Sequence, residues 1–261
     1  MRTLPHRPLL ERYEIKYAIP EALVPLLRSY IQPYMQFDPF ALGVPRHRYR
    51  ISSLYLDTPQ LRLMHDTLDG VRDRFKLRVR AYDDEPDSPI YCEVKQRHGD
   101  VIVKARAPVA RERLAAILRG RGSDIDLPIR ERASLDQFII RGTTSGARPV
   151  LLVRYHREAY ESRFRDRVRI TLDRDLEYLP VRGPQLRVNG AGWQPTRWHP
   201  NPSTVILELK FNLTYPGWVA EMIRRFQLQR RSVAKYVLSM QERIEAERRE
   251  GPLAMGRAAN G

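Results

Sequence analysis

Cysteine is almost absent from this sequence, with Cys92 as the single example. No intrachain disulfide can therefore form, and no cysteine cluster can bind a metal. Such low cysteine usage is typical of a reducing compartment, so we expect a cytoplasmic protein. Long apolar runs are missing too, because no window approaches the ~18 apolar residues of a membrane span. The N-terminal stretch also lacks the apolar centre of a signal peptide. These absences predict a protein that is soluble, or at most peripheral to a membrane.

Common catalytic motifs are missing as well. There is no G-x-x-x-x-G-K-[ST] loop, which excludes ordinary P-loop nucleotide binding, and no H-E-x-x-H or paired-histidine spacing. The six histidines are scattered along the chain. We expect His98 and His156 to be solvated or packed rather than catalytic. Cys92 falls on an apolar strand face, which predicts a core residue rather than a nucleophile.

The charge balance is strongly positive. Lys and Arg number 46 against 31 Asp and Glu, a formal net charge of +15, while 42% of the residues are hydrophobic. The hydrophobic share predicts a sizeable core. The excess charge predicts a polyanionic partner, which is nucleic acid, an acidic membrane surface or a phosphate-rich small molecule. Nucleic acid is not the expected partner, because no aromatic-studded basic face or nucleic-acid motif is present. A cluster of Arg224, Arg225, Arg230 and Arg231 is more typical of a solvated face, with contact to acidic lipid as the alternative.

Segments of alternating polar and apolar residues dominate the chain, which is the pattern of half-buried strands. Their short links favour antiparallel pairing. Expected strands lie at 11–19, 48–58, 74–82, 90–97, 101–107, 148–160, 167–173, 176–181 and 204–211. Expected helices lie at 20–35, 59–70, 110–120, 127–142, 216–229 and 232–250. With no repeat or break in composition, we expect one domain over 8–246 and a disordered tail at 247–261.

The expected strand RFKLRVRAY, at 74–82, has one face made only of cations. Successive side chains of a strand point to opposite faces, so Lys76, Arg78 and Arg80 share one face and apolar residues occupy the other. The same alternation recurs on the other strands. It places on their polar faces Glu14, Lys16, Glu93, Lys95, Lys104, Arg169, Glu208 and Lys210.

Two architectures fit these charged faces. The first is an open sheet whose charged face meets water, which explains any one strand easily. The second is an α+β fold with a closed or nearly closed eight-stranded antiparallel barrel, charged inside, with helices packed on its apolar outside. A dry interior is excluded, because several kcal/mol for each unpaired buried charge, over about ten cations, exceeds the ~5–15 kcal/mol that holds a domain together. The barrel must therefore hold water and anions, and a phosphate chain with a divalent metal suits it.

The order of the motifs resembles the VTC domain, the polyphosphate polymerase core of the vacuolar transporter chaperone complex, which has bacterial relatives. The matching stretches are RYEIKY, YRISSLYLDT, KLRVRAY, CEVKQR, VRYHREAY, RVRITLD, LELKF and AKYVLSM, within residues 10–240. Such proteins belong to the triphosphate tunnel metalloenzymes, so the resemblance implies an eight-stranded antiparallel tunnel.

The resemblance also implies roles for individual residues. Arg78, Arg80, Lys95, Glu208 and Lys235 are the expected catalytic residues, and Glu208 is the expected ligand of Mn²⁺ or Mg²⁺. The residues expected to bind phosphate are Lys16, Arg78, Arg80, Lys95, Lys104, Tyr155, Arg157, Arg169, Lys210 and Lys235. Glu14 and Glu93 are further candidate metal ligands, but each is equally suited to neutralise a neighbouring lysine. We expect Tyr49, Tyr55 and Tyr160 to serve in barrel packing.

Two positions depart from the family pattern. Arg12 stands where tunnel triphosphatases and CYTH-type cyclases begin with a glutamate, which argues against hydrolysis and for a polymerase. Ala234 stands where a serine is expected before Lys235, so a hydroxyl that contacts phosphate is missing.

Three functions remain open at this stage. The first is an ATP-dependent polyphosphate polymerase that passes the γ-phosphoryl group of ATP to a growing chain. The second is a tunnel triphosphatase that hydrolyses tripolyphosphate or nucleoside triphosphates. The third is a non-catalytic module that binds polyphosphate, inositol phosphates or RNA. A separate membrane protein partner would be needed if the product is exported.

Overall fold

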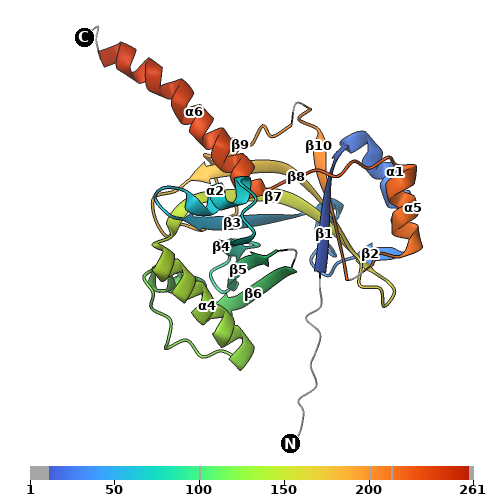
Figure 1. The fold of residues 1–261 in the computed structure, drawn as a ribbon, viewed down its shortest axis with the longest axis horizontal. Coiled ribbons are helices and arrows are strands. Elements are labelled where there is room, and N and C mark those ends of the chain that lie inside the picture. Colours follow the sequence, from blue (N-terminus) through green and yellow to red (C-terminus); the bar gives the residue numbers. More distant parts are fainter. Residues whose placement is uncertain (1–11, 100, 200, 213, 259–261) are drawn as a thin grey trace, which may run out of the picture.

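The computed structural model describes residues 12–99, 101–199, 201–212 and 214–258. Within these residues the protein is α+β, with one ten-stranded antiparallel sheet and six α-helices (Figure 1). The strands are β1 Arg12–Pro20, β2 Met35–Phe37, β3 Tyr49–Asp57, β4 Asp73–Ala81, β5 Ile90–His98, β6 Val101–Val109, β7 Arg148–Ser162, β8 Arg169–Pro180, β9 Gln194–Pro195 and β10 Thr204–Asn212. Their order is β1-β10-β8-β7-β3-β4-β5-β6, with β2 paired to β7 and β9 paired to β8.

The strands expected from alternation are present with small shifts of their ends. The two expected strands at 167–173 and 176–181 form the single strand β8, in which Asp175 adopts a positive φ of 51°. A register shift in β7 between Arg154 and His156 lies opposite this point. A local irregularity therefore bends one long strand pair where the sequence suggested a break.

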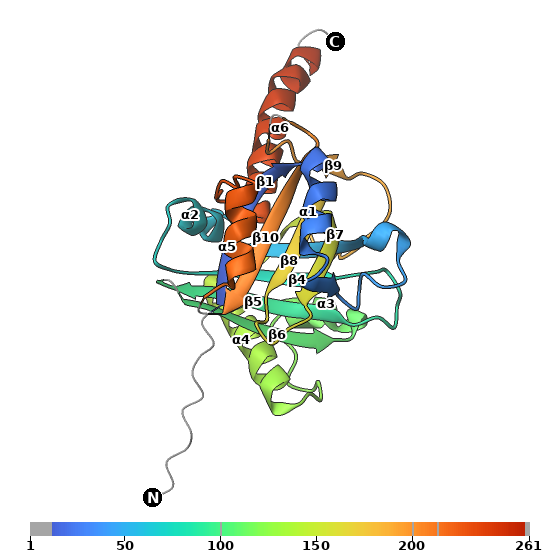
Figure 2. The same ribbon diagram turned by 90° about the vertical axis from the view of Figure 1, so that its right-hand side faces the viewer.

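The sheet curves strongly, so its two end strands approach each other. In Figure 2, β1 and β10 run steeply while β5 and β6 cross beneath them. No backbone pairing joins β1 to β6 in the described ranges. A side-chain ion pair does reach from β1 to β5, because Lys95 Nζ lies 2.9 Å from Glu14 Oε2. Closure of the barrel stays a prediction.

Helices cover the apolar outer face of this sheet (Figures 1 and 2). They are α1 Val24–Ile31, α2 Arg62–Leu68, α3 Leu114–Leu118, α4 Ile129–Ser145, α5 Gly217–Arg225 and α6 Lys235–Ala258. Leu135 and Phe138 of α4 pack with Leu77 and Cys92 of β4 and β5. Cys92 is 0% exposed, so its predicted place in the core is confirmed.

A second apolar cluster joins α1 and α5 to the other side of the sheet, through Leu27 and Val219 against Leu207 and Leu209. A third cluster joins α2 and α6 to β3 and β7, with Val237 in contact with this group. Because the helices pack on the apolar faces of the strands, the charged faces point toward one another on the inner side of the curved sheet.

The helices differ from the expected ranges mainly at their ends. A short 3₁₀ turn at Glu21–Leu23 precedes α1, since Pro25 lies in the first turn of that helix. A second 3₁₀ turn, Arg111–Arg113, precedes α3. A third, Pro45–His47, precedes β3. The sequence did not predict β2 or β9.

Helix α6 continues through most of the segment where a disordered tail is expected. It runs to Ala258, and residues 259–261 lie outside the described residues. The domain boundary at 246 therefore stays a prediction. Among the described residues, no helix is long and apolar enough to cross a membrane.

Candidate functional site

The charged strand faces meet around one cavity of about 240 Å³, here named the central cavity. Side chains from β1, β3, β4, β5, β6, β7, β8, β10 and α6 line it. Among them are the predicted residues Glu14, Lys16, Arg78, Arg80, Lys95, Lys104, Tyr155, Arg157, Arg169, Glu208, Lys210 and Lys235. The charged faces therefore gather around one cavity rather than dispersing over the exterior, while closure of the sheet stays a prediction.

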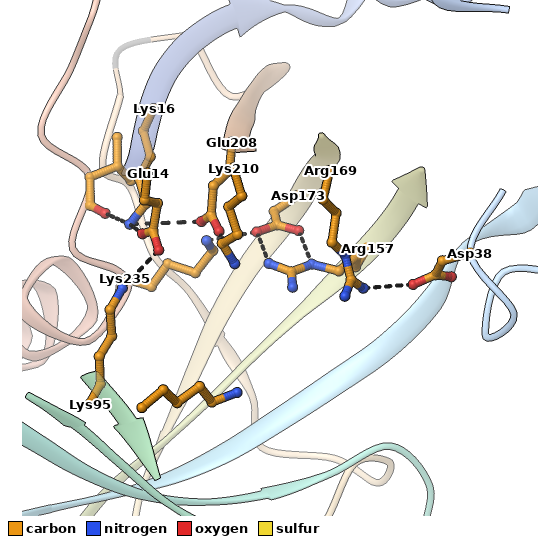
Figure 3. Close-up of polar contacts among 12 residues, drawn as sticks. Glu14, Lys16, Asp38, Lys95, Arg157, Arg169, Asp173, Glu208, Lys210 and Lys235 are labelled. Carbon is orange, nitrogen blue, oxygen red and sulfur yellow. Dashed lines mark hydrogen bonds and ion pairs between the residues drawn. The ribbon is translucent and has the colours of Figure 1, made fainter. Parts of the chain in front are cut away.

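Antiparallel register explains why these side chains converge. On β10, Glu208 lies opposite Lys16 of β1, and Lys210 lies opposite Glu14. On the other side of β10, Lys210 lies opposite Arg169 of β8. Residues directly opposite in a sheet point to the same face, so cations and carboxylates alternate across these three strands. Figure 3 shows the side chains turned toward a common space.

Glu208 is the most enclosed carboxylate that lines the cavity, at 4% exposed. Its Oε1 lies 2.5 Å from Lys210 Nζ, and its Oε2 lies 3.8 Å from Lys16 Nζ. Burial raises the pKa of Glu208, but Lys210 and Lys16 lower it by more, and the net pKa is well below the ordinary value. Glu208 is therefore ionised throughout the neutral range.

Glu14 shares the same lysine. Lys16 Nζ lies 3.1 Å from Glu14 Oε1, so a single ammonium group is held between Glu14 and Glu208. Burial and Glu208 raise the pKa of Glu14, but the surrounding cations, among them Lys16, Lys95 and Lys210, together outweigh them, and the net pKa is depressed. Burial lowers the pKa of Lys16, while both carboxylates raise it, with a net rise.

These two carboxylates fit a small divalent cation. Mg²⁺ and Mn²⁺ take oxygen ligands, and Mg²⁺ is commonly held by one or two carboxylates plus substrate phosphates. Glu14 and Glu208 already bracket one positive charge, the Lys16 ammonium. No group of three or more His, Cys, Asp or Glu side chains able to bind a metal occurs in the described part of the chain. Substrate oxygens would have to complete the coordination.

Glu93 differs from Glu14, because it is not among the residues that line the cavity. It is 1% exposed, and its Oε2 accepts a hydrogen bond of 2.7 Å from Arg78 Nε. Its Oε1 lies 2.8 Å from Lys104 Nζ. Burial raises the pKa of Glu93, but Arg78 and Arg80 lower it by more, with a depressed net pKa. These contacts favour neutralisation of the neighbouring cations over metal binding.

Asp173 is a site residue for which the sequence predicted no role. It is 1% exposed and accepts two hydrogen bonds of 2.7 Å from Arg157. Its Oδ2 also lies 2.7 Å from Lys235 Nζ (Figure 3). Asp173 therefore fixes one cation from β7 and one from α6 at the cavity wall. Its place on the polar face of RVRITLD was the available sequence signal.

Asp38 plays a similar part for Arg169. Its Oδ2 accepts a hydrogen bond of 2.7 Å from Arg169 Nη2 and one of 3.0 Å from the Tyr49 hydroxyl. Asp38 follows β2, which the sequence did not predict, so its position could not be anticipated.

Three tyrosines line the end of the cavity next to α6. Tyr55 accepts a hydrogen bond of 3.2 Å from Arg78 Nη1 and stacks on Tyr236, with ring centroids 4.7 Å apart. Lys235 Nζ lies 4.8 Å from the centre of the Tyr155 ring. Tyr55, expected to serve only in packing, therefore also contacts a predicted catalytic arginine.

The sequence profile of the VTC domain matches residues 11–243. The chain belongs to the VTC domain family. The predicted resemblance is thereby confirmed over nearly all of the described residues. No curated protein sequence matches the chain.

Solved structures that resemble this VTC domain share little sequence with it. A "putative adenylyl cyclase" from Hippeastrum, described as having a dominant triphosphatase activity, is 15% identical over 88% of this chain and 95% of its own, with a TM-score of 0.49. A "putative adenylate cyclase" from Bacillus halodurans is 12% identical over 85% and 92%, with a TM-score of 0.46. A Mimivirus capping enzyme triphosphatase is 10% identical over 83% and 88%, with a TM-score of 0.35.

The VTC domain described here uses its lysines in one place only. The whole chain has six lysines among its 46 basic residues, and all six line the central cavity. They are Lys16, Lys76, Lys95, Lys104, Lys210 and Lys235. The other forty basic residues are arginines, of which five also line the central cavity, while others pair with carboxylates elsewhere, as Arg28 does with Glu158.

A second cavity of about 240 Å³, here named the side cavity, adjoins the first in this VTC domain. The two share the lining residues Glu14, Lys16, Lys76, Lys95, Ile102 and Ala234. Arg230 and Arg231 line the side cavity, while Arg224 and Arg225 lie on α5. The four arginines predicted to cluster are therefore split into a pair at the side cavity and a pair on α5. Ala234, at the position where serine was expected, borders both cavities.

The two histidines considered in the sequence lie outside both cavities. His98 Nδ1 is 3.2 Å from Asp73 Oδ1, and His156 Nδ1 is 3.0 Å from Asp175 Oδ2. Both pairs are at the protein surface, in agreement with a solvated rather than catalytic role.

Proposed function

We propose that this VTC domain is a metal-assisted, ATP-dependent polyphosphate polymerase. The terminal oxygen of a polyphosphate chain attacks the γ-phosphorus of ATP, the bond from that phosphorus to the β–γ bridging oxygen breaks, and ADP leaves. The observation that supports this proposal best is the charge of the central cavity. Its lining residues include eleven Lys and Arg side chains against two carboxylates, Glu14 and Glu208.

Such a cavity suits a ligand with many negative charges. Even with the neighbouring carboxylates of Glu93 and Asp173 counted, the cations remain in large excess. A linear phosphate chain supplies about one charge for each phosphate, with closely spaced oxygens that each accept hydrogen bonds. Inositol phosphates satisfy the same charge requirement and are a further ligand class for the site.

Phosphoryl transfer needs little covalent chemistry from a protein. Catalysis comes from positioning the two reactants and from neutralising the charge on the transferred group. Arg78 and Arg80 offer planar guanidinium groups that suit bidentate contact with phosphate oxygens. Lys95 and Lys235 provide compact ammonium charges from two different elements, β5 and α6. In this proposal no side chain acts as a nucleophile.

Glu208, with Glu14 beside it, would hold Mn²⁺ or Mg²⁺ in the proposed enzyme. When bound, such an ion neutralises phosphate oxygens and helps to orient the leaving group. Lys16 lies between the two carboxylates, so in this proposal its ammonium group moves to phosphate oxygens when the ion is present.

The polymerase is tested by incubating the purified protein with ATP and Mn²⁺ and separating the products. Long-chain polyphosphate together with ADP supports the proposal. Arg78→Ala and Glu208→Ala should each lower turnover by at least tenfold. Arg224→Ala, an exposed substitution on α5, is the matched control and should retain wild-type turnover. Full turnover in both cavity variants would show that the assigned site is wrong.

A tunnel triphosphatase is the second candidate. It is favoured by the presence of two carboxylates, Glu14 and Glu208, in a cavity that water can enter. Release of free phosphate without any chain product would support this candidate and overturn the polymerase. Tight binding of polyphosphate without turnover would instead support a non-catalytic binding module. A membrane protein partner and a cytoplasmic location stay predictions.

A further inference from the structure

Lys76 is a basic residue for which the family resemblance implied no role. It belongs to β4 and lines both the central and the side cavity. Its side chain therefore lies in the wall where the two cavities adjoin.

Three lysines lie side by side in this wall. Lys76 of β4 is directly opposite Lys95 of β5, which is directly opposite Lys104 of β6. Like charges directly opposite in a sheet are destabilising. Lys95 has a carboxylate partner, Glu14, at 2.9 Å, and Lys104 has Glu93 at 2.8 Å, although burial still lowers the pKa of both, that of Lys104 to about 7. Within the described residues, Lys76 has no carboxylate at ion-pair distance.

The groups around Lys76 are mostly cations. Burial lowers the pKa of Lys76 to about 7, and the nearby charges of Lys16, Lys95, Arg74 and Arg78 act in the same direction. The other charged residues that line the two cavities are Glu14, Arg80, Arg97, Lys104, Arg157, Arg167, Arg169, Glu208, Lys210, Arg230, Arg231 and Lys235. In the ligand-free protein near pH 8, Lys76 is therefore largely a neutral amine.

We propose that Lys76 is a phosphate-binding residue that takes up one proton when a polyphosphate chain enters the cavities. The inference rests on the proposed phosphate-handling function. The neutral amine gains a proton from solvent, and the resulting ammonium group donates hydrogen bonds to phosphate oxygens. The ligand supplies the negative charge that Lys76, alone among the three lysines of the row, does not obtain from a carboxylate.

The residue type supports the same inference. Arginine keeps its proton under all ordinary conditions, whereas a buried lysine can lose it. This chain uses arginine for forty of its 46 basic residues and places every lysine in the central cavity. The cavity wall therefore contains a cation that can lose its proton when the cavity is empty and regain it when phosphate binds.

Calorimetry of tripolyphosphate binding tests the proposal with the intact protein. Titrations at pH 8 in buffers of different ionisation enthalpy give the number of protons taken up for each ligand bound. Tripolyphosphate contributes the same protons in every variant, so the difference between variants is the decisive quantity. Wild type should take up about one proton more than Lys76→Arg. Lys76→Met should lose the same proton and bind at least tenfold more weakly.

Lys210→Arg is the matched control, because Lys210 already pairs with Glu208 and should leave the proton count at the wild-type value. Circular dichroism verifies that each variant is folded, and the two Lys76 variants check each other. Equal proton uptake by wild type and both Lys76 variants would overturn the role of Lys76 while leaving the phosphate site intact. Failure of wild type to bind tripolyphosphate at all would overturn the proposed function itself.

Discussion

The hydroxyl of Tyr236 donates a 2.6 Å hydrogen bond to Asp57 and thereby fastens the start of α6 to the end of β3. The same carboxylate accepts backbone hydrogen bonds from Leu63 and Met64 in α2. Asp57 is 0% exposed. Because Lys235 immediately precedes Tyr236, this one carboxylate fixes the place from which Lys235 enters the cavity.

Tyr236→Phe should therefore impair both stability and turnover. Loss of a hydrogen bond to a buried carboxylate costs about 1–3 kcal/mol of unfolding free energy, and a displaced Lys235 should lower kcat. Urea denaturation and polyphosphate synthesis provide the measurements. Tyr30→Phe is the matched control, because the Tyr30 hydroxyl donates a 2.9 Å bond to the Trp218 carbonyl away from the cavity. That control should lose stability and keep its turnover. Equal turnover in the two variants would contradict a positioning role for Tyr236.

Lys76→Met should stabilise the ligand-free protein. Its pKa is about 7 in the folded state, below the ~10.4 of an unfolded lysine. At neutral pH the unfolded chain therefore binds one proton more than the folded protein, so Lys76 lowers the free energy of unfolding. This loss shrinks as the pH rises toward the pKa of the unfolded lysine. We expect Lys76→Met to raise the free energy of unfolding by about 1–3 kcal/mol at pH 7 and by less toward pH 10. Urea midpoints at the two pH values measure it, with Lys76→Arg as the variant that shows no gain. A loss of stability in Lys76→Met at pH 7 would contradict this expectation.

Acid should destabilise the protein through its cavity carboxylates. Burial raises the pKa values of Glu208 and Asp173, but the cations around each carboxylate together lower them by more, so both are held down in the folded state. Their stabilisation is complete above their unfolded pKa values near 4 and is lost as pH falls below them. Urea midpoints between pH 7 and pH 3 should drop steeply below about pH 4. The urea midpoint should fall less with pH in Glu208→Gln. The same pH dependence in that variant and in wild type would contradict a contribution from Glu208.

Ala234→Ser should strengthen phosphate binding. The added hydroxyl would lie on the wall common to both cavities, next to Lys235. A hydrogen bond from a hydroxyl to a charged oxygen contributes about 1.5–2 kcal/mol, which corresponds to roughly tenfold tighter binding. Calorimetry with tripolyphosphate and the KM for ATP measure the change. Ala234→Val is the control for size alone and should bind no more tightly than wild type.

The strands and the residues of the charged faces were predictable because they follow a period of two along the chain. That period alone placed Lys16, Arg80, Lys95 and Arg169 on polar faces. It did not identify β2 or β9, since each is two or three residues long and exists only by pairing with β7 or β8. Short pairings of this kind depend on tertiary contacts that a local pattern does not contain.

The partners of the cations were harder to anticipate than the cations themselves. Asp173 stood on a predicted polar face, yet its contacts with Arg157 and Lys235 depend on β8, β7 and α6 coming together. Asp38 lies outside any alternating segment. The approach of β1 to β5, through Glu14 and Lys95, joins residues 81 positions apart. Contacts over such separations follow from the curvature of the whole sheet.

The confinement of all six lysines to one cavity has a practical consequence for anyone who handles this protein. Amine-directed crosslinkers, biotinylation reagents and coupling resins would react with the chain terminus or inside the cavity. A lysine-specific protease would find its cleavage points only in the strands and helix that form that wall. Dyes for imaging, and tethers for surface immobilisation, are better attached to an engineered cysteine, since the native thiol is buried.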